Sequence, residues 1–527
     1  MALHSTSLIP LLILTLILSP VLSLPPPTLQ PECATSKKSS SSSASAGAFN
    51  PSSSFLSTLR STIDQINSVV SIVSTFSGIL GGDLRLSSAV SDCLDLLDLS
   101  SDELSWTISA SQASPASSGG TGNRRSDLRS WLSAALGNQE TCKESLAGSD
   151  SILSSLIGDG LQAVNSLVAD GLSEVAAAGG GGGGRRLVEG FPEWVRKGER
   201  SLLQTAAGSG LAVDAVVAQD GSGNYTTVEA AVEAAPAESG KRHVIYVKKG
   251  VYKENVEIKK KKWNIMLVGD GMGQTIISGS RSFVDGWTTF RSATLAANGQ
   301  GFIARDLTIE NTAGPSKHQA VALRSDSDLS VFYRCSFEGY QDTLYAHSLR
   351  QFYRDCRITG TVDFIFGNAA AVFQNCQILA RRPLSDQKNS ITAQGRKDPN
   401  QNTGFSLQFC NITADSDLVG FTNQTSTYLG RPWKEYSRTV IMQSYIGSVV
   451  RPEGWLEWNG NFALDTLFYG EFMNSGPGSG LGGRVKWSGF HAITDSAQAV
   501  NFTVSQFIDG NLWLPSTGVK YTAGLMV

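Results

Sequence analysis

Five polar residues in the C-terminal half of the chain have the types and spacing of a hydrolytic site. Asp342 and Asp363 are 21 residues apart, and Gln319 and Gln341 are 22 apart. Two carboxylates held close together repel, so one is driven toward its protonated form while the other stays ionised. The first can then act as an acid, and the second as a base or nucleophile. Arg431 could keep one carboxylate ionised through a two-point ion pair.

The side chains around these carboxylates would complete such a site. The amides of Gln319 and Gln341 can donate hydrogen bonds to an oxyanion, which is usually the largest contribution in acyl transfer. Phe366, Tyr345 and Trp433 offer flat surfaces for sugar rings. A purely structural explanation stays open, because stacked polar side chains also satisfy the turns of a repeat protein.

A repeat in the same region indicates how these residues are positioned. Cys335, Cys356 and Cys376 each lie in a short β-type segment and recur after 21 and then 20 residues. Such a period, with short strands and Gly or Asn turns, predicts an all-β solenoid, most simply a parallel β-helix. A β-sandwich would need hairpin turns between the repeated strands. The available candidates, Asn298-Gly299 and Asn459-Gly460, do not flank them.

The solenoid would bring the polar residues together. Residues one period apart stack on neighbouring turns, about 4.8 Å apart. We therefore predict that segments 318–323, 340–345 and 363–367 form three successive turns. Two carboxylates and two amides would then share one patch of the wall.

The chain divides into segments of unlike composition. Apolar residues at spacings of three and four recur in segments such as 86–97 and 128–136, which indicates a bundle of amphipathic helices. Six glycines from Gly179 to Gly184 form a linker. We predict a signal peptide (1–23), a Ser-rich disordered segment (24–51), an all-α four-helix bundle (52–178), a Gly-rich linker (179–210) and an all-β domain (211–527).

Several features favour export. An apolar stretch near the N-terminus ends in small residues that suit cleavage after Ser23, although an uncleaved signal anchor is the alternative. Arg185-Arg186 and Arg200 lie in or near the linker as candidate processing sites, or as a solvated charge pair in the case of the dibasic motif. Four possible glycosylation sites have the Asn-x-Ser/Thr pattern: Asn224, Asn411, Asn423 and Asn501.

Other functions are disfavoured by what the sequence lacks. A formal net charge of −3 gives no basic surface of the nucleic-acid-binding type. Seven cysteines include no C-x-x-C and there is no H-E-x-x-H, so we expect no metal and no cofactor. With five histidines and no G-x-S-x-G, a Ser-His-Asp triad has little support. His318 and His347 are expected to be structural or to lie at the rim of the site.

The motifs at 250–254, 341–344, 363–367 and 429–433, with the Gln319 segment, resemble the pectin methylesterase family from about Val213 to the C-terminus. The resemblance implies a right-handed parallel β-helix. It also implies a pectinesterase that acts on methyl-esterified homogalacturonan, secreted to the plant cell wall and monomeric.

The resemblance also assigns roles to the five polar residues. Asp363 would attack the C6 methyl-ester carbonyl, and Asp342 would protonate the departing methanol and then activate water. Gln319 and Gln341 would stabilise the oxyanion, and Arg431 would position Asp363. The substrate contacts that it implies are those of Thr289, Arg431 and Trp433.

The helical segment is similar to the invertase and pectin methylesterase inhibitor family at 91–94 and 138–142. This implies a Cys93–Cys142 disulfide. It also implies that the helical segment acts as an intramolecular inhibitor until a processing protease removes it, and that it binds its own or other esterase domains. The family's N-terminal cysteine pair is not matched, since only Cys33 occurs there.

Two questions stay open on the sequence. The pectin methylesterase family implies a Cys376–Cys410 disulfide, whereas Cys335 and Cys356 could pair or remain thiols. The sequence lacks the signatures of a polygalacturonase, which disfavours a polygalacturonase or lyase. A non-enzymatic protein, with an inhibitory helical part and a wall-binding β part, is the remaining alternative.

Overall fold

The computed structural model describes residues 51–76, 82–112, 120–147, 152–178 and 212–526. The predicted signal peptide, most of the Ser-rich segment and the linker with Arg185, Arg186 and Arg200 lie outside these ranges, as does Cys33. Among the described residues, no helix has both the length and the apolar character needed to cross a membrane.

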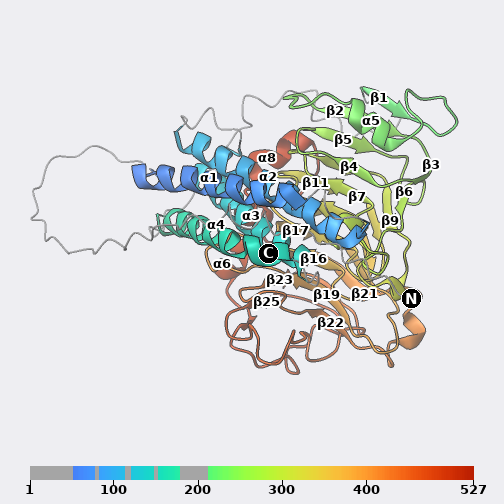
Figure 1. The fold of residues 1–527 in the computed structure, drawn as a ribbon. Helices are drawn as coiled ribbons and strands as arrows, with labels where there is room; N and C mark the ends of the chain where they lie inside the picture. Colours follow the sequence, from blue (N-terminus) through green and yellow to red (C-terminus); the bar gives the residue numbers. More distant parts are fainter. Residues whose placement is uncertain (1–50, 77–81, 113–119, 148–151, 179–211, 527) are drawn as a thin grey trace, which may run out of the picture. The chain divides into compact units, whose positions relative to one another are not determined.

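Four long helices form the N-terminal bundle (Figure 1). They are α1 (Ser53–Phe76), α2 (Leu84–Gln112), α3 (Arg124–Leu146) and α4 (Ile152–Ala177). Each helix buries an apolar stripe, for example Leu59, Ile66 and Val73 of α1 at spacings of seven residues. The predicted Cys93–Cys142 disulfide is confirmed, and it joins α2 to α3.

Within residues 212–526, the strands form a parallel β-helix made of three sheets. The largest sheet runs β1 (Ala215–Val217), β2 (His243–Val247), β5 (Ile265–Val268), β8 (Ile303–Arg305), β11 (Ser330–Tyr333), β14 (Arg350–Arg354), β17 (Ala370–Gln374), β20 (Gly404–Gln408), β23 (Arg438–Met442), β25 (Phe468–Phe472) and β26 (Phe490–Ala492). The second runs β24 (Tyr445–Ile446), β21 (Asn411–Ala414), β18 (Gln377–Ala380), β15 (Arg357–Gly360), β12 (Ser336–Glu338), β9 (Thr308–Asn311), β6 (Thr275–Gly279) and β3 (Gly250–Lys253). The third runs β22 (Thr427–Gly430), β19 (Asn389–Gln394), β16 (Ile365–Gly367), β13 (Leu344–Ala346), β10 (Leu323–Ser325), β7 (Leu295–Ala297) and β4 (Val256–Ile258). The prediction of a β-helix is confirmed.

Short helices complete the domain. They are α5 (Val228–Ala234), which packs on β1, β2 and β4, and α6 (Ser496–Ala499), α7 (Val504–Phe507) and α8 (Gly510–Thr517) near the C-terminus. Phe507 and Trp513 belong to one buried cluster with Phe352 and Val372. The C-terminal helices therefore cover the outer face of the largest sheet.

The register of the third sheet sets the spacing of the predicted polar residues. Leu323 pairs with Leu344, and Leu344 pairs with Ile365, all in parallel strands. Each step is 21 residues, so the three predicted turns are successive. Asp342 and Asp363 precede β13 and β16 by the same number of residues, and so they take equivalent positions on neighbouring turns.

The predicted Cys376–Cys410 disulfide is wrong, because both residues are free buried thiols, like Cys335 and Cys356. Within the stack of inward-facing side chains, these thiols have backbone partners instead. Cys376 Sγ donates to the Tyr353 carbonyl at 3.7 Å, and Cys410 Sγ donates to that of Phe373 at 3.3 Å. Burial also raises the pKa of the Cys356 and Cys410 thiols, which keeps these two side chains in their unreactive form.

Candidate active site

A cavity of about 440 Å³ contains every residue predicted to catalyse or to bind substrate. They are Thr289, Gln319, Gln341, Asp342, Tyr345, Asp363, Phe366, Arg431 and Trp433. These residues come from separate turns of the β-helix, and the parallel register brings them to one wall.

The two aspartates have the same unusual backbone conformation. Asp342 has φ of 62° and Asp363 has φ of 51°, which is the left-handed region that Asp and Asn tolerate better than most residues. The Asp342 amide donates to the Val362 carbonyl at 3.0 Å, which ties the two turns together directly before Asp363. Both residues are buried, with Asp342 7% exposed and Asp363 5% exposed. The turns therefore fix both carboxyls at the cavity.

Arg431 makes the two carboxyls electrostatically different. Its Nε donates to Asp363 Oδ1 at 2.8 Å, and its second guanidinium nitrogen donates to Oδ2 at 2.7 Å. This bidentate pair favours the ionised form of Asp363. Among the described residues, no such pair is made by Asp342.

The pKa of Asp342 is raised well above its usual range. Burial is the main cause, and the neighbouring charge of Asp363 adds to it, while Arg431 acts in the opposite direction. One carboxyl of the pair is thus suited to hold a proton and the other to remain an anion.

The predicted oxyanion donors also face the cavity. Gln319 and Gln341 both line it, and the Oε1 atom of Gln341 is buried without a hydrogen-bond partner among the described residues. An unsatisfied buried amide oxygen is costly unless a donor binds to it. This favours contact of Gln341 Oε1 with a donor group of a bound molecule, whereas an oxyanion would have to accept from Nε2.

The aromatic residues form a connected wall. The rings of Tyr345 and Phe366 stack at 4.1 Å, and Trp433 lies 5.9 Å from Phe366. Trp458 was missed by the sequence prediction, although it lines the cavity and lies 4.4 Å from the guanidinium of Arg431. It belongs to no repeated strand, so no periodic signal could indicate it.

The helical bundle closes part of this cavity, which the sequence prediction did not place. Arg85 of α2 and Thr141, Glu144 and Ser145 of α3 are lining residues. Tyr345 and Phe366 belong to the same buried cluster as the apolar core of the bundle. The surfaces that would hold a sugar are therefore covered by helices.

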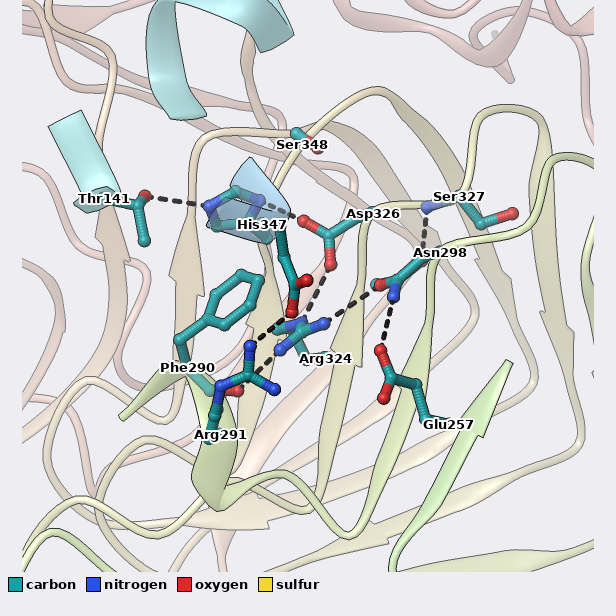
Figure 2. A network of polar contacts seen from close by, with 12 residues as sticks. Thr141, Glu257, Phe290, Arg291, Asn298, Arg324, Asp326, Ser327, His347 and Ser348 are labelled. Carbon is teal, nitrogen blue, oxygen red and sulfur yellow. Dashed lines mark hydrogen bonds and ion pairs between the residues drawn. The ribbon is translucent and has the colours of Figure 1, made fainter. Parts of the chain in front are cut away.

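A polar network joins α3 to the wall beside the cavity (Figure 2). His347 lies between Thr141, with Oγ1 at 2.8 Å from its Nε2, and Asp326, with which it makes an ion pair. Arg324 donates to Asp326 at 2.9 Å and to the Phe290 carbonyl at 2.7 Å. His347 is buried, with 3% exposed, whereas His318 is exposed and does not line the large cavity.

Ion pairs extend the contact on both sides. Arg291 pairs with Asp92 of α2 at 2.7 Å. Arg350 is fully buried between Asp127 of α3 and Asp328 of the β-helix, at 2.6 Å from each. The bundle is thus held on the β-helix by buried charges as well as by apolar packing.

The remaining predicted sites lie away from the cavity. Asn224, Asn411, Asn423 and Asn501 are all exposed. Among the described residues, no three His, Cys, Asp or Glu side chains converge on a position that could hold a metal ion.

Comparisons with known proteins agree with this geometry. A family model described as pectinesterase matches residues 214–511, and one described as plant invertase/pectin methylesterase inhibitor matches residues 28–175. The chain therefore belongs to the pectinesterase family, and carries an N-terminal part similar to its inhibitors.

Relatives and solved structures extend the match. A pectinesterase/pectinesterase inhibitor of Prunus persica is 64% identical over 89% of this chain and 89% of its own. A probable protein of the same kind from Arabidopsis thaliana is 58% identical over 90% and 91%. The solved pectin methylesterase from carrot is 59% identical, with a TM-score of 0.60, and covers 60% of this chain and 99% of its own. The chain is therefore a pectinesterase, which is a carboxylic ester hydrolase, with an inhibitor-like N-terminal part. The alternative of a non-enzymatic wall-binding protein is not supported.

Proposed function

We propose that this pectinesterase removes C6 methyl esters from homogalacturonan through an acyl-enzyme on Asp363. The observation that carries the proposal is the asymmetry of the two carboxyls, with Asp363 paired to Arg431 and Asp342 having a raised pKa. An ionised carboxylate can attack, and a protonated one can donate to the leaving group.

The first half of the reaction uses both carboxyls. A carboxylate oxygen of Asp363 attacks the ester carbonyl carbon, and the resulting oxyanion accepts hydrogen bonds from the amides of Gln319 and Gln341. The bond to the methoxy group then breaks, and Asp342 gives its proton to that oxygen. Methanol leaves, and the galacturonyl group remains on Asp363 as an anhydride.

The second half restores the enzyme. Asp342, now ionised, accepts a proton from water, whose oxygen attacks the galacturonyl carbonyl. The bond to Asp363 breaks, and the free acid leaves. Asp363 is again a carboxylate paired with Arg431, and Asp342 is again protonated.

The wall of aromatic rings supports a sugar-chain substrate. Stacked Tyr345 and Phe366, with Trp433 beside them, present flat apolar faces of the kind on which sugar rings rest. Thr289 lies in the same cavity and can bond a hydroxyl.

The helical part acts as an intramolecular inhibitor in this proposal. Its support is that Thr141, Glu144 and Ser145 stand in the cavity where substrate would lie. Cutting near Arg185-Arg186 or Arg200 would release residues 211–527 as the mature enzyme in the cell wall. The exposed sequons would then carry glycans on an exported protein.

Methanol release from pectin tests this proposal directly. The full chain and residues 212–527 are compared on the same methylated pectin, with polymer length followed in parallel. We expect methanol without chain shortening, and much more of it from residues 212–527. Normal turnover by Asp363→Ala would rule out the assigned nucleophile. Equal activity in both chains would rule out inhibition by the helices.

A further inference from the structure

Two lysines lie next to the catalytic cavity, and the proposed reaction uses neither of them. Lys434 and Lys397 line a second small cavity of about 20 Å³, which shares Tyr345 and Trp433 with the large one. Lys434 Nζ lies 5.6 Å from the ring centre of Trp433. A positive region therefore begins where the aromatic wall ends.

Among the described residues, the carboxylates paired with these lysines come only from α3. Glu140 accepts from Lys434 at 3.1 Å and pairs closely with Lys397, and Glu144 pairs with Lys434 at 2.6 Å. When α3 is absent, Lys397 and Lys434 lose all of these ion-pair partners, because none of them belongs to the β-helix. Two cations beside a cavity would then be unpaired.

The spacing of the two glutamates is informative. They are four residues apart on α3, which places them side by side on one face of the helix, about 5–6 Å apart at Cβ. Successive carboxylates are also what a de-esterified stretch of polygalacturonate presents. Helix α3 thus offers the lysines the same chemical groups as the product of the reaction.

We propose that Lys397 and Lys434 bind the ionised carboxylates of galacturonate units near the ester being cleaved, and that α3 blocks this site with Glu140 and Glu144. The inference rests on the proposed function, since it assigns a substrate preference to that same cavity. A methyl ester carries no charge and cannot form the ion pairs. The site therefore distinguishes free acid from ester in the units flanking the reaction.

The balance of charge and burial fits a site of this kind. In the closed chain, burial would raise the pKa of Glu140, but Lys397 and Lys434 outweigh it and hold that pKa below its usual range. At Glu144, burial outweighs Lys434 and raises the pKa, so the charge match is firmer at Glu140. Lys434 is largely covered, with 18% of its side chain exposed. With α3 in place, the ion pairs of Lys434 with Glu140 and Glu144 are therefore partly shielded from salt.

Residues 212–527 are the appropriate protein for the test. The carrot enzyme shows that this part of the family folds alone, because its whole chain corresponds to 60% of this one. Wild-type, Lys434→Gln and Lys397→Gln are assayed on fully methylated pectin and on partly de-esterified pectin. Lys260→Gln is the control, because Lys260 pairs with Asp98 and Asp102 of α2 outside the catalytic cavity.

We expect wild-type and Lys260→Gln to favour the partly de-esterified substrate. Each of the other two variants should lose about fivefold of that preference, mainly through KM, and should be less inhibited by added polygalacturonate. Lys434→Arg should restore the preference. An unchanged ratio of kcat/KM on the two substrates would overturn the inference, as would loss of all turnover in both Lys434 variants.

A second measurement uses the full chain. Glu140→Gln with Glu144→Gln removes the two negative charges of α3 that pair with these lysines and should raise methanol release toward that of residues 212–527. No increase would contradict the blocking role. If wild-type residues 212–527 release no methanol from either pectin, the proposed function itself fails, and this outcome is distinct from an active enzyme without preference.

Discussion

Arg431 donates two hydrogen bonds, of 2.8 and 2.7 Å, to Asp363. This ion pair distinguishes Asp363 from Asp342, which otherwise has an equivalent position. Asp342 and Asp363 occupy the same place on successive turns and share a left-handed backbone. Their environments differ chiefly in the guanidinium. A repeated fold that would otherwise make two like carboxyls has made two unlike ones.

Replacing either aspartate by asparagine tests this division. Asp363→Asn should abolish methanol release, because the amide cannot attack. Asp342→Asn should slow it by roughly 10²–10⁴-fold, the usual range for a general acid or base. Asp355→Asn is a matched control, since Asp355 has φ of 55° and does not line the cavity. Residues 212–527 would be assayed with folding checked by circular dichroism, and full activity in Asp342→Asn would refute its role.

Arg431 also controls the pH at which Asp342 loses its proton. Because Arg431 lowers the pKa of Asp342, its removal should raise that pKa further. The protonated form then persists to higher pH, so the alkaline limb of kcat/KM in Arg431→Gln should move upward. Arg431→Lys keeps the charge and should leave that limb near its original position while reducing kcat. A limb that stays fixed in Arg431→Gln would contradict this coupling.

The sequence predicted the β-helix, and the common wall on which the candidate catalytic residues lie, because residues one 21-residue period apart take equivalent positions on neighbouring turns. Once Leu323, Leu344 and Ile365 are in register, Asp342 and Asp363 take equivalent positions on neighbouring turns and line the same cavity. The same period could not decide whether Cys376 and Cys410 bond to each other, since neighbouring thiols can equally donate to carbonyls.

The contact between bundle and β-helix was beyond sequence reasoning for a different reason. Helix periodicity identifies which face of α3 is apolar, but not what it packs against. Thr141 lies in the segment 138–142 that resembles the inhibitor family, and Glu144 follows it, but neither the motif nor the helix pattern indicates a contact for them. Only their contacts with His347 and Lys434 give them a role.

The buried ion pair of Asp127 and Arg350 should strengthen closure of the cavity by α3. Asp127→Asn leaves Arg350 with Asp328 alone, in a place where neither can reach water. We expect packing of the bundle to weaken by roughly 2 kcal/mol, below the usual cost of breaking a whole buried pair because one partner remains. The full chain should become more active and more sensitive to protease. Asp64→Asn, at an exposed position on α1, should change neither.

Three arginines oppose that closure. Burial lowers the pKa of Arg129 on α3, of Arg396 and of Arg438. The charge of Arg129 adds to this effect at Arg396, whose pKa falls to about 10, and at Arg438. Arg129 Nε and one nitrogen of Arg438 are buried without partners among the described residues. Arg129→Met should therefore tighten closure by about 1 kcal/mol, despite the lost bond to the Asn400 carbonyl. The activity of the full chain should fall, whereas Arg60→Met on the exposed face of α1 should leave it unchanged.

Closure should also depend on pH through Glu103. Burial is the main cause that raises the pKa of this α2 carboxyl well above its usual range, and the charge of Asp326 on the β-helix adds to it. Burial similarly raises the pKa of Asp92, against the effect of Arg291. A carboxyl with a raised pKa in the closed chain costs nothing below its ordinary pKa, where it is protonated in both states. The stability of closure is then lost as pH rises toward the raised pKa.

The full chain should accordingly be most inhibited in acid and should open as pH rises. Asp326 acts in the opposite direction, because His347 and Arg324 outweigh burial and lower its pKa. Glu103→Gln keeps the acceptor for Asn138 but cannot ionise, so it should flatten the pH dependence. The measurement is the activity of the full chain divided by that of residues 212–527 at each pH. A ratio that is constant from acid to neutral pH in the wild type, or equally steep in Glu103→Gln, would exclude Glu103 as the responsible group.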